Sequence, residues 1–145
     1  MTTEPVTSPA LVAEADLTAI GQTVAAYLEW SRTGAEGAFG EAFHPAATVV
    51  NASNGDDKVL PWTVQQFAAG VERLRATHGM VEETARSTAV DLAGNVASVR
   101  IDFDLKIGSD LHVGTDFLVL ARVGDRWLIT QKVYSSDRPY KGPPQ

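Results

Sequence analysis

A single carboxylate interrupts one of the most apolar stretches of the sequence. In "GTDFLVLARVGDRWLITQKVY", residues 114–134, Asp116 opens a run of Phe, Leu, Val and Leu. Strand alternation places Asp116 on the same face as Leu118 and Leu120. Burial raises the pKa of a carboxyl group until the neutral acid can donate a hydrogen bond. Asp116 is therefore expected either to face a cavity as a donor or to stay ionised in water at the open end of its strand.

The histidines do not predict a metal site. His44, His78 and His112 are separated from one another, and the sequence has no His-x-His or Glu-x-x-His pairing. The absence of cysteine excludes disulfides, thiolate catalysis and cysteine-ligated zinc. Histidine can act as a base near neutral pH, so His44 is a candidate base, although a histidine before proline can equally cap a helix end. We therefore expect neither a metal nor a cofactor.

Composition restricts the partners of the protein. The 145 residues correspond to one domain, and the formal net charge is −6. A basic patch for phosphates is not expected, which argues against nucleic acid as a partner. The N-terminus lacks a basic segment followed by an apolar core, and no apolar run reaches the roughly 20 residues that span a membrane. We expect a cytoplasmic protein without a membrane partner.

Helical periodicity dominates the first half of the chain. Apolar residues at helical spacing predict a helix that starts at Ser8-Pro9 and continues to about Ser31. A break at Gly34 precedes a short helix, which ends before Pro45. After a short strand in "ATVVNA" and a turn in "SNGDDK", Thr63 and Gln66 match a capping box at the start of a third helix. Gly79 is expected to end that helix.

The second half of the chain alternates with a period of two. Strands are predicted at about 82–92, 95–107, 111–123 and 126–135, joined by turns at "LAGN", "IGSD" and "VGDR". In the second of them, Val99, Ile101 and Phe103 alternate with Arg100, Asp102 and Asp104. We expect these charges to form a ladder on a solvated or interfacial face, matched by Lys132 or Arg122. If this face is instead the concave one, the same charges would make the pocket polar. The order of elements predicts an α+β domain at 12–135, between flexible segments at 1–11 and 136–145.

Three segments together resemble the nuclear transport factor 2-like superfamily, which includes ketosteroid isomerases and SnoaL-like cyclases. They are "AAYLEWSRTGAEGAFGEAFHPAATVV", the helix "WTVQQFAAGV" and the terminal hairpin with Gly124, Trp127 and Ile129. Within the superfamily, the Asp-aromatic-x-x-Leu strand and the Lys-Val-Tyr ending look most like the putative lumazine-binding group. The resemblance covers roughly residues 12–135. It implies a cone-shaped fold in which three helices pack on a curved, mainly antiparallel sheet and enclose a pocket.

The resemblance also implies roles for single residues. Tyr27 and Asp116 fall where the isomerases carry their oxyanion donors, although Tyr27 could equally be a core residue. The isomerases place a general-base carboxylate at the position of Asn51, and an amide cannot abstract a proton. Steroid isomerisation by the usual route is therefore excluded, and His44 at the pocket rim is the candidate for a relocated base. The pocket wall is expected to include Asn51, Trp62, Phe67, Phe103, Leu118 and Trp127.

Three functions remain open, because this superfamily hosts enzymes and binding modules alike. The favoured function is the binding of a small apolar or ring-containing molecule in a pocket bearing a few polar groups. The second is a cofactor-independent isomerase, dehydratase or cyclase that uses Tyr27 and Asp116 as donors. The third is a dimeric interaction module without a ligand. A homodimer through the outer face of the sheet, where Phe117 and Val119 would lie, is implied by the resemblance.

Overall fold

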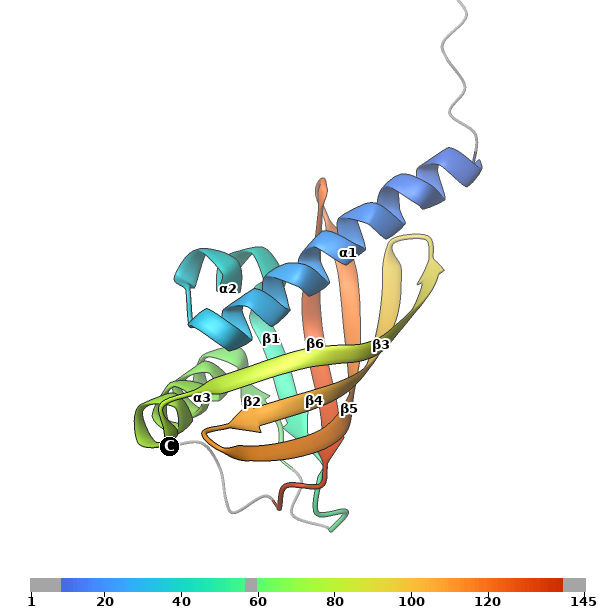
Figure 1. Cartoon of the computed structure of the whole chain (residues 1–145). Coiled ribbons are helices and arrows are strands. Elements are labelled where there is room, and N and C mark those ends of the chain that lie inside the picture. Colours follow the sequence, from blue (N-terminus) through green and yellow to red (C-terminus); the bar gives the residue numbers. More distant parts are fainter. Residues whose placement is uncertain (1–8, 57–59, 140–145) are drawn as a thin grey trace, which may run out of the picture.

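In the described part of the chain, three helices pack against one six-stranded sheet (Figure 1). The structure is a computed structural model that describes residues 9–56 and 60–139. The helices are α1 (Pro9–Thr33), α2 (Glu36–Ala42) and α3 (Val64–His78). The strands are β1 (Phe43–Asn51), β2 (Trp62–Thr63), β3 (Val81–Ala93), β4 (Val96–Ile107), β5 (Asp110–Val123) and β6 (Arg126–Ser136). The expected α+β architecture is confirmed.

The sheet is mixed and open. Its strand order is β2-β1-β6-β5-β4-β3, and β1 runs parallel to β6 while every other pairing is antiparallel. The four long strands β3–β6 follow the chain as a meander. In Figure 1 the meander curls, with α1 lying across it and α3 near its lower end. Residues 1–8 and 140–145, which belong to the segments expected to be flexible (1–11 and 136–145), and Asp57 and Lys58 of the expected turn lie outside the described residues.

Local sequence accounts for the ends of α3. The Thr63 hydroxyl accepts a hydrogen bond from the backbone N–H of Gln66 at 3.1 Å, and the Gln66 side chain accepts one from the N–H of Thr63 at 3.0 Å. This is the predicted capping box. Gly79 ends the helix with a φ of 83°, a left-handed conformation that glycine adopts without steric cost. None of the described helices is long and apolar enough to cross a membrane.

The core lies between α1 and the concave face of the sheet. Val99, Ile101 and Phe103 of β4 are at most 1% exposed, as their alternation predicts. They pack with α1 residues such as Ile20 and Tyr27. Burying a large apolar side chain contributes about 1.5–3 kcal/mol, so this layer holds the helix on the sheet.

An irregularity in β6 changes which of its side chains face inward. The register passes from Leu120 opposite Ile129 to Val119 opposite Gln131, so Thr130 is an extra residue in the strand. Such a bulge shifts the alternation by one position. Lys132, which follows it, is therefore on the concave face and only 2% exposed.

The charged residues Arg100, Asp102 and Asp104 of β4 consequently have other partners than predicted. Lys132 does not pair with the ladder on β4, because the bulge turns it toward the core. Arg86 of β3 lies 3.1 Å from Asp104, and Arg100 lies 3.2 Å from Asp102. Arg122, the other expected partner, instead forms an ion pair with Asp16 of α1. The ladder itself lies on the outer face as expected.

Candidate functional site

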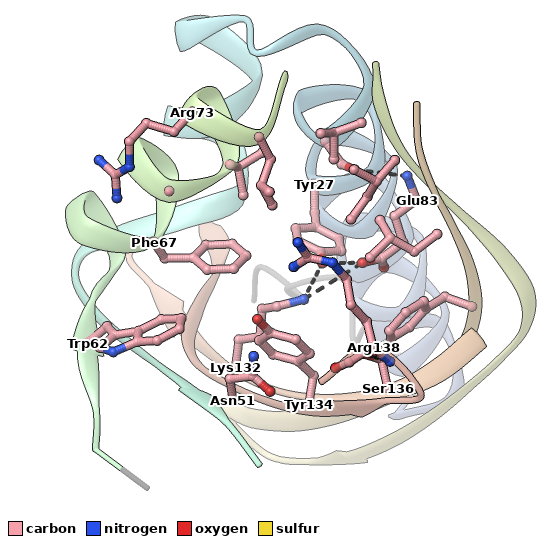
Figure 2. A pocket seen from close by; sticks show the side chains of 18 of the residues that line it. Tyr27, Asn51, Trp62, Phe67, Arg73, Glu83, Lys132, Tyr134, Ser136 and Arg138 are labelled. Atoms are coloured by element: carbon pink, nitrogen blue, oxygen red, sulfur yellow. Dashed lines mark hydrogen bonds and ion pairs between the residues drawn. The ribbon is translucent and has the colours of Figure 1, made fainter. Parts of the chain in front are cut away.

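A cavity of about 490 Å³ opens between α1, α3 and the concave face of the sheet (Figure 2). This volume is within the range of small-molecule sites, roughly 300–1,000 Å³. The helices contribute Tyr27, Ser31, Phe67, Gly70, Val71, Arg73, Leu74 and Thr77 to its lining. The strands and loops contribute Asn51, Trp62, Val81, Glu83, Phe103, Leu105, Ile107, Lys132, Tyr134, Ser136 and Arg138.

Aromatic rings form much of the cavity wall. Phe67 of α3 and Tyr134 of β6 meet edge to face, with ring centroids 6.1 Å apart. Tyr27 of α1, Trp62 of β2 and Phe103 of β4 are the other aromatic residues of the lining. Figure 2 shows Trp62, Phe67 and Tyr134 around one side of the hollow. Flat apolar walls of this kind suit the faces of a planar ring.

One buried cation marks the floor of the cavity. Lys132 Nζ donates a hydrogen bond to Asp116 Oδ1 at 2.7 Å and another to the hydroxyl oxygen of Tyr27. The same nitrogen lies 4.7 Å from the ring centroid of Tyr27, 5.4 Å from that of Phe67 and 4.6 Å from that of Tyr134. The negative faces of these rings and the Asp116 carboxylate offset the loss of hydration of the ammonium.

Tyr27 connects the cation to a second carboxyl group. Its hydroxyl donates to Glu83 Oε1 at 2.7 Å and lies 3.4 Å from Asp116 Oδ2. Burial, and then the charges of Asp116 and Glu83, raise the pKa of Tyr27 well above its ordinary value. The phenol therefore stays protonated and acts as a hydrogen-bond donor at the floor of the cavity.

Glu83 is the other titratable group with a shifted pKa at the floor. Its backbone N–H donates to Ser31 Oγ at 3.0 Å, which fixes this part of β3 against α1. Burial, and then the charge of Asp116, raise the pKa of Glu83 well above its ordinary value, while Lys132 lowers it by less. The Oε2 atom of Glu83 is buried and has no hydrogen-bond partner among the described residues.

The structure brings together most, but not all, of the sequence-predicted site residues. Tyr27, Asn51, Trp62, Phe67 and Phe103 line the cavity. Asn51 is also engaged locally, since its Oδ1 accepts from the backbone N–H of Ser53 at 3.0 Å.

The other predicted residues lie elsewhere. Asp116 is completely buried behind Lys132, outside the lining of the cavity. Leu118 and Trp127 belong to the core. His44 Nδ1 accepts a hydrogen bond from the backbone N–H of Ala46 at 3.0 Å, away from the cavity. Their functional roles stay predictions.

Sequence reasoning missed Glu83 and Lys132. The bulge at Thr130 hides Lys132, because simple alternation from Ile129 assigns position 132 to the outer face. Glu83 had a signal, since it alternates with Val81, which is also buried. The polar surroundings of that stretch, "VEETARST", concealed it.

The comparisons with known proteins agree with this fold. A family described as putative lumazine-binding matches residues 15–135. An NTF2-like protein of unknown function from Shewanella baltica OS155 is 21% identical, with 93% of this chain and 100% of that chain covered and a TM-score of 0.66. An NTF2-like protein of unknown function from Silicibacter pomeroyi DSS-3 is 20% identical, with 86% and 98% covered and a TM-score of 0.64.

A third solved structure has an enzyme name. It is described as a putative scytalone dehydratase from Novosphingobium aromaticivorans DSM 12444, with 13% identity, coverage of 90% of this chain and 95% of that chain, and a TM-score of 0.68. At these identities the likeness concerns the fold alone. The search among curated proteins found no match.

Proposed function

The chain belongs to the putative lumazine-binding family and has the NTF2-like fold, and from this we propose that it binds a small ring-containing molecule in the cavity above Lys132. The observation that carries the proposal is a buried ammonium at the floor of a cavity of about 490 Å³ whose walls are largely aromatic and aliphatic. Pockets that combine apolar walls with a few convergent polar groups are typical small-molecule sites.

The polar groups at the floor favour an acceptor oxygen on the ligand. Lysine has three N–H donors, and Lys132 uses two of them in hydrogen bonds to described residues. The third can reach a carbonyl oxygen or an oxyanion. Arg138 follows β6, and in Figure 2 its side chain extends over the cavity. A flat bicyclic dione such as lumazine, which gives the family its name, meets these requirements and is the first probe to use.

The binding test compares two matched pairs of variants. Lumazine is titrated into the full chain by isothermal titration calorimetry. Lys132→Met alone would leave Asp116 as a buried charge without its cation, so it is combined with Asp116→Asn. A hydrogen bond to a charged group contributes about 1.5–3 kcal/mol, which predicts a loss of about tenfold or more in affinity. Lys106→Met with Asp104→Asn, on the outer face, should bind like the wild type. Equal binding by both double variants would overturn the proposal.

Catalysis is the second candidate function. It is favoured by two acids beside the cavity, Tyr27 and Glu83, whose pKa values are both raised. Such groups could act in a cofactor-independent isomerase, dehydratase or cyclase, for which Tyr27 is the donor that lines the cavity. Asp116 would then act through Lys132 as a positioning residue. Turnover of a ring-containing substrate that survives Tyr27→Phe unchanged would contradict this role of Tyr27.

We also propose a homodimer formed through the outer face of the sheet. Phe117 of β5 is 52% exposed there, and the Arg100 guanidinium lies 5.6 Å from the centroid of its ring. Val96 and Val113, on the same face, are 52% and 42% exposed. Sedimentation velocity should give a dimer for the wild type and a monomer for Phe117→Lys. A wild-type monomer at high protein concentration would contradict this assembly.

A further inference from the structure

Two buried carboxyl groups lie around one ammonium at the floor of the cavity. Asp116 Oδ1 is 2.7 Å from Lys132 Nζ, and Glu83 Oε1 is 3.8 Å from the same nitrogen. The Tyr27 hydroxyl also lies within reach of both, 2.7 Å from Glu83 Oε1 and 3.4 Å from Asp116 Oδ2. Glu83 is 6% exposed and Asp116 is 0% exposed, so bulk water has little access to either of them.

The charges of this cluster do not balance if both carboxyl groups are ionised. On the cavity side, the titratable side chains around Glu83 are Tyr27 from α1, Asp116 from β5, and Lys132 and Tyr134 from β6. From β4, the apolar Phe103 and Leu105 line the same cavity, and Arg138 lines it beyond β6. On the other side, Glu83 borders a shallow hollow that is also lined by Glu29 and Arg32 of α1 and Glu82 of β3. Lys132 is the single cation within hydrogen-bond or ion-pair distance of these carboxyl groups among the described residues. Two carboxylates and one ammonium leave one excess negative charge in a buried cluster.

An unpartnered atom indicates where a proton is held. Glu83 Oε2 is buried and lacks a hydrogen-bond donor among the residues that the structure describes. An ionised oxygen in that position would be costly, whereas a protonated one donates to a neighbouring carboxylate. A hydrogen bond to Asp116 is among the causes that raise the pKa of Glu83, after burial and the charge of Asp116.

We propose that Glu83 and Asp116 share one proton, which leaves their cluster with Lys132 neutral, and that the pair passes this proton to the oxyanion of a weakly acidic ring compound, a phenol or an enol. The second half of this inference rests on the proposed binding function. In the transfer, an O–H bond of the carboxyl pair breaks as an O–H bond forms on the ligand. The negative charge moves from the ligand to the pair, beside Lys132, and the total charge is unchanged.

The shared proton makes binding depend on pH. While the carboxyl pair keeps its proton, the cluster of Glu83, Asp116 and Lys132 is neutral and does not repel an anionic ligand. Once the proton is lost, the cluster is negative and repels the anion. The affinity for the anion should therefore fall by about tenfold per pH unit above the titration of the pair. Replacing Glu83 by glutamine removes the titrating group but keeps a similar shape and an acceptor for Tyr27.

The first test needs no ligand. Infrared spectroscopy of the full chain at neutral pH should show the carbonyl stretch of a protonated carboxylic acid, which is distinct from the carboxylate bands. The band should be absent in Glu83→Gln and retained in Glu82→Gln, a matched control beside it on β3 that does not line the cavity. No band in the wild type, or a band that survives Glu83→Gln, would overturn the proposal.

A second measurement uses the wild type alone, so it remains informative if the Glu83→Gln variant does not fold. In the wild type, a ¹³C NMR titration of side-chain carboxyl carbons should show one group still protonated at neutral pH. A titration in which every carboxyl is ionised there would also overturn the proposal.

The transfer is tested with 4-nitrophenol, whose absorbance distinguishes the phenol from the phenolate. Phenolate affinity should decline with pH in the wild type and stay level in Glu83→Gln. Identical pH profiles would overturn the proton transfer. If the acid band is present but neither protein binds 4-nitrophenol, the proposed binding of such ligands fails while the shared proton stands.

Discussion

Tyr27 and Lys132 lie 105 residues apart in the sequence and meet at one hydrogen bond, from Lys132 Nζ to the hydroxyl oxygen of Tyr27. The contact joins α1 to β6 at the floor of the cavity, and the ring of Tyr27 lies 4.7 Å from the same ammonium. The ring of Tyr27 therefore packs in the core, while its hydroxyl contributes to the polar floor of the cavity. Changes at this pair should affect stability and binding together.

Tyr27→Phe should lower the free energy of unfolding by about 1–3 kcal/mol, because Lys132 loses an acceptor and Glu83 loses a donor. The ring and its packing are kept, so the fold should survive. Urea denaturation followed by circular dichroism measures the change. Thr18→Val removes an exposed hydroxyl on α1 that bonds Glu14 O, and should stay within about 0.5 kcal/mol of the wild type. Equal effects of the two substitutions would contradict a special role of the Tyr27 hydroxyl.

Glu83 should make the protein less stable as the pH rises. Its pKa is raised in the folded chain, so the folded state holds this proton more tightly than the unfolded state does. The associated stability is complete below the ordinary glutamate pKa of 4.5 and is lost as the pH rises through the higher folded value. Glu83→Gln should flatten the unfolding free energy over that window, as measured by urea denaturation across pH. A slope equal to that of the wild type would refute the linkage.

Asp102 on the outer face should behave in the opposite way. The Thr115 hydroxyl, followed by the Ser87 hydroxyl and Arg100, lowers its pKa from 3.8 to about 2. Its contribution is present above the ordinary value and is lost as the pH falls toward the folded value. The urea midpoint of Asp102→Asn should therefore decline less on acidification than that of the wild type. The exposed Asp91→Asn serves as the control, and a wild-type acid response in Asp102→Asn would count against this assignment.

Gly114→Ala should destabilise the end of β5 that borders the cavity. An added Cβ would meet the backbone oxygen of Ser135 and, at 2.6 Å, the ring of Phe103. Overpacking of this kind costs about 1–3 kcal/mol, which a thermal melt detects. Gly37→Ala in α2 meets nothing within 4 Å and should be neutral or slightly stabilising. Similar melting temperatures for the two variants would show that the strand end can adjust.

The order of elements was predictable because their signals are local. Alternation in residues 96–107 and the capping box at Thr63 both depend on near neighbours in the chain, and both are observed. The short strand β2 was not predicted, because two residues carry no periodicity and exist as a strand only by pairing with β1.

The site was only partly predictable, since its polar centre depends on a bulge and on contacts distant in sequence. Tyr27 and the aromatic wall followed from the resemblance. The inward position of Lys132 follows from the extra residue at Thr130. The amino-acid pattern of the strand does not indicate where such a bulge occurs. Asp116 is buried as the parity of its strand indicated, but its place behind Lys132 could be known only once that lysine was located.

The central claim is that the cavity holds a ring-containing small molecule, and native mass spectrometry of the gently purified chain with added lumazine tests it most directly. Leu105→Trp would fill the cavity from β4, while Leu111→Trp enlarges a side chain that is 59% exposed on β5. The wild type and Leu111→Trp should carry one added small-molecule mass per chain, and Leu105→Trp should not. A wild-type chain without added mass, or equal occupancy in all three proteins, would contradict the account.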